Sequence, residues 1–136
     1  MKRLLYAAGL FTALGCIVQA QSATAIARAD VPFNFRMGSS SIMPAGTYLV
    51  QQSGAVLTVR EEGGTNKSAM QLTLPTSRTV VSAQPKLEFH RYGSAYFLSA
   101  VWIENSHEGR ALPKSKSEQE LSRRAEFVQT ADVSLR

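Results

Sequence analysis

Hydrophobic and polar residues alternate along most of this chain, in short runs separated by Gly, Pro, Asn or Ser at intervals of eight to twelve residues. An alternating run puts its apolar side chains on one face of an extended segment, as in a strand with one buried face. Short strands with regular turn signals are typical of a sandwich or barrel. We therefore predict an all-β, antiparallel domain of seven or eight strands over residues 31–112, as a sandwich or a partly closed small barrel.

The first run, 31–37, has apolar residues at every second position. Pro32 lacks a backbone N–H, so it belongs at a sheet edge or at the start of its strand. Further strands are expected at 47–52, 55–61, 69–74, 78–83 and 110–112. In the run 69–74, burial at every second position predicts an interior location for three apolar side chains: Met70, Leu72 and Leu74.

The clearest element is a hairpin in which 86–92 and 95–103 flank Gly93 and Ser94. Glycine at the first turn position fits a type II′ two-residue turn. This turn pairs Tyr92 with Ala95, Phe89 with Leu98 and Leu87 with Ala100. One face is then mostly large and apolar, and we assign it to the core: Leu87, Phe89, Arg91, Tyr96, Leu98, Ala100 and Trp102. The other face is mixed: Glu88, His90, Tyr92, Phe97, Ser99 and Val101.

The chain changes character after Gly109, and Pro113 ends the last expected strand. Ser115 followed three residues later by Glu118 is typical of a capping box at a helix start. We predict a C-terminal helix within 113–128, with Leu121 among the residues on its apolar face. The polar ends of the mature chain, 21–30 and 129–136, are expected to be a flexible lead-in and a frayed tail.

Residues 1–20 resemble a secretory signal peptide. Lys2 and Arg3 precede an apolar run that is too short to span a bilayer, and the small-residue pattern ending at Ala20 suits a signal peptidase. We therefore expect an exported protein, periplasmic or secreted, without a transmembrane span after processing. A lipid anchor on Cys16 is the disfavoured alternative, because Ala13 and Leu14 stand in the reverse of the usual lipoprotein order.

Composition narrows the classes of function. Cys16 is the only cysteine, so the mature domain of 116 residues has no disulfide. Loss of Lys2 and Arg3 with the leader lowers the formal net charge from +5 to +3. The remaining cations are dispersed, and where they are densest, at 110–124, acidic residues stand among them. Nucleic-acid binding needs a continuous basic surface, so no nucleic-acid partner is expected.

Few residues suggest catalysis. His90 lies between Glu88 and Tyr92 on one strand face, which could form an acid–base cluster or an ordinary polar face of the hairpin. His107 lies in a loop with Glu104 and Glu108, which could hold a cation loosely or be solvated. The chain has no G-x-S-x-G, Walker A or G-x-G-x-x-G motif. We therefore predict no catalytic residue, no cofactor and no metal, with Glu88, His90 and Tyr92 as the one candidate polar cluster.

Four segments form a recognisable set: V-P-F-x-F-x-x-G at 31–38, P-A-G-x-Y at 44–48, L-x-F-x-x-Y-G-x-x-Y-F-L-x-x-x-W at 87–102 and G-R-x-L-P-x-S at 109–115. In these segments the chain resembles a group of small exported bacterial proteins over nearly the whole mature domain. No activity is assigned to the group, so the resemblance implies one exported domain and transfers no site residue. Ser94 departs from the group, which usually has an acidic residue after Tyr-Gly.

Three functions are compatible with these observations. The leading hypothesis is a non-enzymatic envelope or periplasmic protein that binds or scaffolds, recruiting an envelope protein by strand addition at an open edge such as 31–37. The first alternative is a carrier of a small apolar ligand in a barrel cavity lined by the aromatic residues, which otherwise simply form the core. The second is an enzyme that uses Glu88, His90 and Tyr92.

Overall fold

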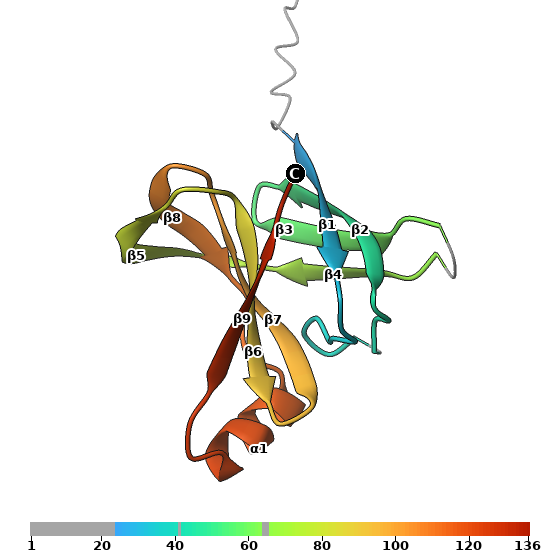
Figure 1. The fold of residues 1–136 in the computed structure, drawn as a ribbon, viewed down its shortest axis with the longest axis vertical. Coiled ribbons are helices and arrows are strands. Elements are labelled where there is room, and N and C mark those ends of the chain that lie inside the picture. Colours follow the sequence, from blue (N-terminus) through green and yellow to red (C-terminus); the bar gives the residue numbers. More distant parts are fainter. Residues whose placement is uncertain (1–23, 41, 64–65) are drawn as a thin grey trace, which may run out of the picture.

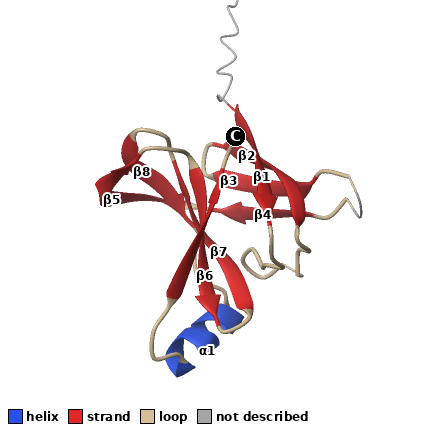
Figure 2. Ribbon diagram, viewed as in Figure 1, coloured by secondary structure: helices blue, strands red, loops and turns tan. Residues whose placement is uncertain are grey.

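The structure, a computed structural model, describes residues 24–40, 42–63 and 66–136. They form two antiparallel sheets and one helix (Figures 1 and 2). One sheet has the order β1-β2-β3-β4, with β1 Thr24–Val31, β2 Gly46–Ser53, β3 Val56–Glu61 and β4 Ser68–Leu72. The other has the order β5-β8-β7-β6-β9, with β5 Leu74–Ser82, β6 Lys86–Tyr92, β7 Ala95–Trp102, β8 Ser106–Ala111 and β9 Gln129–Ser134. Helix α1 spans Lys116–Arg124. The predicted all-β sandwich with one short helix is confirmed, and the described residues form no closed barrel.

The two sheets are joined at two corners. Thr73 lies between β4 and β5 and is 3% exposed. Its backbone N–H and its hydroxyl both donate to the carbonyl of Ala55, at 2.7 and 2.8 Å, and the Arg110 guanidinium donates to the Thr73 hydroxyl and carbonyl oxygens. At the second corner Arg28 and Arg136 exchange backbone hydrogen bonds of 2.8 and 3.0 Å, so the chain end lies beside β1 (Figure 1). Hydrogen bonds thus satisfy the backbone N–H and C=O groups at the two places where the sheets meet.

Side chains from both sheets fill the space between them. Phe35, Tyr48 and Phe89 are each at most 1% exposed, and the Phe35 ring centroid lies 5.1 Å from that of Tyr48 and 5.3 Å from that of Phe89. These edge-to-face contacts are the preferred geometry of aromatic pairs. Because each ring comes from a different segment, the cluster ties the residues before β2 to both sheets.

The strand predicted at 31–37 is wrong. β1 ends at Val31, and the next residues make only isolated bridges, between Phe35 and Met43 and between Arg36 and Phe97 of β7. Pro32 cannot continue the backbone hydrogen bonding of a strand, so pairing stops there. The predicted alternation of burial holds, with Val31, Phe35 and Met37 buried. Because Arg36 exchanges backbone hydrogen bonds of 2.9 Å with Tyr96 and Leu98, this segment offers no open edge.

The predictions for the two ends of the mature chain are also wrong where the structure describes them. Residues 24–31 pair with β2 along their whole length, and Gln129–Ser134 pairs with β6 from Arg91 to Lys86. Partner strands supply hydrogen bonds that local composition does not reveal. The helix is shorter than 113–128, because Ala125 has extended φ and ψ of −79° and 134°. The predicted signal peptide, 1–20, lies outside the described residues.

One extra residue in β7 changes the register of the central hairpin. Tyr92 pairs with Ala95 and Phe89 with Leu98, as predicted, but Leu87 pairs with Val101 instead of Ala100. Ser99 is the additional residue, and its hydroxyl donates to the Glu88 carbonyl at 2.9 Å. Such a bulge exchanges the faces of all residues beyond it. Val101 therefore joins the core, and Trp102 moves to the face of Glu88 and His90.

Replacement of Gly109 by alanine is predicted to destabilise the fold. Gly109 pairs with Trp102, and a Cβ there would lie 2.6 Å from both the indole Cε3 and the Val101 carbonyl oxygen. We expect the free energy of unfolding to fall by about 1–3 kcal/mol in urea titrations, as for an overpacked core. Gly46→Ala is the control, since its nearest contact would be an ordinary 3.8 Å, and it should change stability by less than about 0.5 kcal/mol. Equal effects of the two substitutions would contradict the proposed packing of Trp102 on β8.

Candidate functional site

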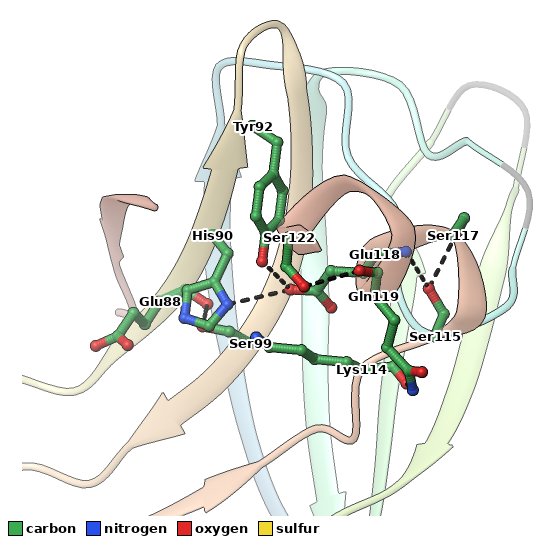
Figure 3. Close-up of polar contacts among 10 residues, drawn as sticks. All are labelled: Glu88, His90, Tyr92, Ser99, Lys114, Ser115, Ser117, Glu118, Gln119 and Ser122. Carbon is green, nitrogen blue, oxygen red and sulfur yellow. Dashed lines mark hydrogen bonds and ion pairs between the residues drawn. The ribbon is translucent and has the colours of Figure 1, made fainter. Parts of the chain in front are cut away.

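The predicted polar cluster lies where helix α1 covers the outer face of β6 (Figure 3). Ser115 caps the start of the helix, and its hydroxyl accepts a hydrogen bond of 3.2 Å from the Glu118 N–H. This is one half of the predicted capping box. Figure 3 shows the Glu118 side chain directed toward β6, so its carboxylate binds the sheet instead of completing the box.

Glu118 is the centre of the cluster. It is 4% exposed, and its Oε1 lies 3.1 Å from Nδ1 of His90 and accepts a hydrogen bond of 3.1 Å from the Tyr92 hydroxyl. A buried carboxylate without partners would be very unfavourable, so these contacts are needed for α1 to pack here. A carboxylate in the first turn is also favoured by the partial positive charge of the helix N-terminus.

Glu88 is separated from the other two predicted residues. Its Oε2 accepts a hydrogen bond of 3.0 Å from the Trp102 indole and lies 3.8 Å from a terminal nitrogen of Arg78. The Arg78 guanidinium carbon in turn lies 3.6 Å from the centroid of the Trp102 ring, in a cation–π contact. The structure therefore brings His90 and Tyr92 together through Glu118, and places Glu88 in a second cluster with Arg78 and Trp102.

A small pocket of about 210 Å³ touches both clusters, and its lining includes Glu88, His90, Trp102, Lys114 and Glu118. Acid–base catalysis requires a nucleophile or substrate atom within reach of the base. The nearby hydroxyl of Ser99 donates to the Glu88 carbonyl, and Nδ1 of His90 is engaged with Glu118. Within the described residues, no hydroxyl or thiol nucleophile is hydrogen-bonded to His90. The contacts that we observe hold α1 on the sheet.

The pKa of Tyr92 supports this structural role. Burial, followed by the negative charge and the hydrogen bond of Glu118, raises the pKa of Tyr92 from 10.0 to about 12. The phenol is therefore neutral at physiological pH and acts as a hydrogen-bond donor. A tyrosine held in this state does not serve as a base near neutrality.

Glu118, Arg78 and Trp102 are the members that sequence reasoning missed as site residues. Glu118 was assigned only to the helix cap, and Trp102 to the core face of the hairpin. An acidic residue at the third helix position is ordinary on its own, and only the long-range packing of α1 on β6 buries it. No local pattern marks the Ser99 bulge that turns Trp102 outward.

The second predicted histidine contacts these clusters only through the backbone of Arg78. His107 is exposed, with Nδ1 at 3.1 Å from the Arg78 carbonyl oxygen. In the part of the chain that the structure describes, no three His, Cys, Asp or Glu side chains are grouped in a way that could hold a metal ion. Over the same residues, no helix has both the length and the apolar character needed to cross a membrane.

Comparisons with known proteins add no relative. No protein family, no curated protein and no solved structure matches this chain. The resemblance to small exported bacterial proteins therefore stays a prediction, and the function has to be argued from the geometry of the described residues.

Substitution of Tyr92 by phenylalanine is predicted to make the free energy of unfolding fall less steeply as the pH rises above 10. Below about pH 10 the phenol is neutral in the folded and the unfolded chain, and its stabilising effect is complete. Between pH 10 and about 12 the unfolded chain ionises first, because the folded pKa is raised, so the stabilisation is lost. We expect the free energy of unfolding, measured in urea from pH 8 to pH 11, to fall less steeply for Tyr92→Phe than for the parent.

Tyr48→Phe provides an independent comparison, because burial also raises the pKa of Tyr48 to about 12. It should reduce the alkaline slope separately, and the effects of the two substitutions should add. A Tyr92→Phe variant with the parental slope would show that Glu118 and burial do not hold the phenol neutral.

Proposed function

We propose that this protein is an exported, non-enzymatic binding or scaffolding protein that holds another envelope polypeptide along the open edge of β4. The single observation that carries the proposal is an exposed row of apolar side chains on β4 and at the first residue of β5. We call it the apolar stripe and define it as Met70, Leu72 and Leu74, which are 70%, 66% and 62% exposed.

The apolar stripe reverses the burial predicted for this run. Ala69 and Thr73 face the interior, at 7% and 3% exposure, and the larger apolar side chains between them face outward. Burial of one such side chain contributes about 1.5–3 kcal/mol, so the exposed row favours association with another apolar surface. Contiguous exposed apolar residues typically mark interaction sites.

The backbone of β4 is suited to receive a strand. β4 is the last strand of its sheet. Thr73 donates its N–H to Ala55 next to β3, and alternate residues of a strand point their backbone groups to opposite sides. The N–H and C=O groups of Met70 and Leu72 therefore face the open side. β4 also contains no proline and no charged residue, which are the features that usually block pairing at an edge.

The occupant that fits is an extended segment with apolar side chains at alternate positions. Its backbone would bond to Met70 and Leu72, and its outward side chains would lie beside the apolar stripe. This is recognition by strand addition, in which backbone bonds supply affinity and side chains supply specificity. The edge at 31–37, expected from the sequence to play this part, is already paired with β7 and Met43.

The two alternative functions have less support. A carrier of a small apolar ligand needs a cavity between the sheets, and Phe35, Tyr48 and Phe89 occupy that space. An enzyme would need a reactive group beside His90, whose Nδ1 is engaged by Glu118. The apolar stripe, by contrast, has no covering segment among the described residues.

Photo-crosslinking in the native host tests the strand-addition site. A benzophenone amino acid at position 72 is expected to crosslink to one partner polypeptide. The same probe at Thr130 should not crosslink to this partner. Thr130 is an exposed position on β9, which is the edge strand of the second sheet farthest from β5. Met70→Arg should abolish the adduct while leaving the urea unfolding midpoint unchanged, because Met70 is exposed. With a peptide copied from the crosslinked segment, amide hydrogen exchange should slow at Met70 and Leu72 first.

Equal crosslinking at positions 72 and 130, or peptide binding that leaves both amides unprotected, would contradict strand addition at β4. If crosslinks form only between copies of this chain, the edge of β4 serves self-association and does not bind another polypeptide.

Export is tested separately from binding. Residues 1–20 fused to a reporter enzyme that folds only outside the cytoplasm should give an active reporter, because Lys2, Arg3 and the apolar run direct translocation. Replacing both cations with glutamate in the fusion should reduce the activity severalfold. An inactive reporter with a normally expressed fusion would show that the segment does not direct export.

A further inference from the structure

One end of the molecule combines arginines with exposed apolar side chains. It is formed by α1, by the segment that joins α1 to β9, by the end of β6 with the turn that follows it, and by Arg36 of the segment before β2. Helix α1 lies next to this turn (Figure 1). We call this surface the basic tip. Its members are Arg36, Arg91, Arg123, Arg124, Phe127 and Val128.

The four arginines of the basic tip form no ion pairs within the described residues, and they outnumber the two carboxylates beside them, Glu120 and Glu126. Among the described residues, Arg28, Arg78 and Arg136 each have an acidic partner, but none of the four arginines of the basic tip does. Arg91 donates to the Gly93 carbonyl at 2.7 Å, which fixes its side chain without removing its charge. Glu120, one turn before Arg124, forms no ion pair with it. The local excess of positive charge is therefore available to an anionic partner.

The apolar members lie among these charges. Phe127 is 69% exposed and Val128 is 41% exposed. Phe127, Arg91 and Arg124 line one surface groove of about 450 Å³, and Arg124 also lines, with Arg36, a second groove of about 480 Å³. Phe127 thus shares one groove with two of the arginines, and Arg124 also belongs to the groove lined by Arg36.

We propose that the basic tip binds the surface of an anionic phospholipid bilayer. Guanidinium groups pair with headgroup phosphates through two hydrogen bonds at once, and exposed aromatic and aliphatic side chains enter the boundary between headgroups and acyl chains. A soluble polyanion such as an acidic polysaccharide would satisfy the arginines, but it offers no apolar phase to Phe127. The exposed Phe127 ring beside Arg91 and Arg124 is the observation that selects the bilayer.

This inference is independent of the binding function proposed for β4, because the basic tip and the apolar stripe share no residue. A protein with both surfaces would hold its partner polypeptide next to a membrane. If the experiments contradict binding at one surface, the proposal for the other surface can still be tested.

Co-sedimentation with lipid vesicles tests the inference. The full chain and its variants are mixed with vesicles of equal parts phosphatidylglycerol and phosphatidylcholine, or with phosphatidylcholine alone. No partner polypeptide is present, and any contribution of residues 1–23 is common to all samples. We expect binding to the anionic vesicles that exceeds binding to the neutral ones and weakens as salt is raised.

Matched variants assign this binding to the basic tip. Arg124→Gln should weaken it about fivefold, the usual contribution of one arginine at an anionic surface. Arg60→Gln removes the same charge from an exposed position on β3 and should leave binding unchanged within about twofold. Phe127→Ser should weaken binding about tenfold at every salt concentration. Val80→Ser, at a side chain that is 72% exposed on β5, should have no effect.

Equal losses for Arg60→Gln and Arg124→Gln would overturn the inference, because the attraction would then come from net charge alone. Unchanged binding of Phe127→Ser, together with full competition by soluble dextran sulfate, would show that the basic tip binds polyanions in solution and not a bilayer. The inference would also be excluded if the parent protein bound anionic and neutral vesicles equally.

Discussion

The central hairpin must place one face in a closed apolar interior and the other under a helix, and a single extra residue in β7 decides which side chains go where. At Ser99 two residues oppose one, and the Ser99 hydroxyl bonds to the Glu88 carbonyl. Beyond this bulge, Val101 enters the core and Trp102 turns outward. Gly109, opposite Trp102, leaves the room that the indole needs to lie on β8. A slip of one residue would reverse every one of these positions.

The outward face depends on a different kind of interaction. Helix α1 has few apolar residues with which to bind the sheet, and the only fully buried side chain in it is the acidic Glu118. Its carboxylate is stable there because His90 and Tyr92 provide partners, and because the start of a helix favours negative charge. Removing one partner of such a group costs more than the bond itself contributes, since the remaining group stays buried and unpaired. The packing of α1 therefore explains why His90 and Tyr92 stand on the outer face of β6.

The surfaces left outside these arrangements are the ones that suggest function. A sandwich of this size satisfies its interior with side chains from both sheets and from the 32–43 segment, and the large apolar residues of β4 are not needed there. They remain exposed on an edge whose backbone is also open. The arginines around Phe127 are likewise free of acidic partners within the described residues. Exposed apolar area and unpaired charge both gain free energy by association, so they are the natural places for a partner or a membrane.

Features that depend only on neighbouring residues could be predicted from the sequence. The strands expected at 47–52 and 55–61 are present, and burial at every second position holds there for Tyr48, Val50, Leu57 and Val59. Gly93 adopts the positive φ, +62°, that the tight hairpin turn requires, and Ser115 caps the helix through its own hydroxyl. Such features follow from local geometry and propensity. The tertiary structure alone decided the strands at 24–31 and 129–134, the face of the apolar stripe, the bulge at Ser99 and the burial of Glu118. Each of these depends on which distant strand supplies hydrogen bonds or space, and the period of a single segment holds no information about its partner.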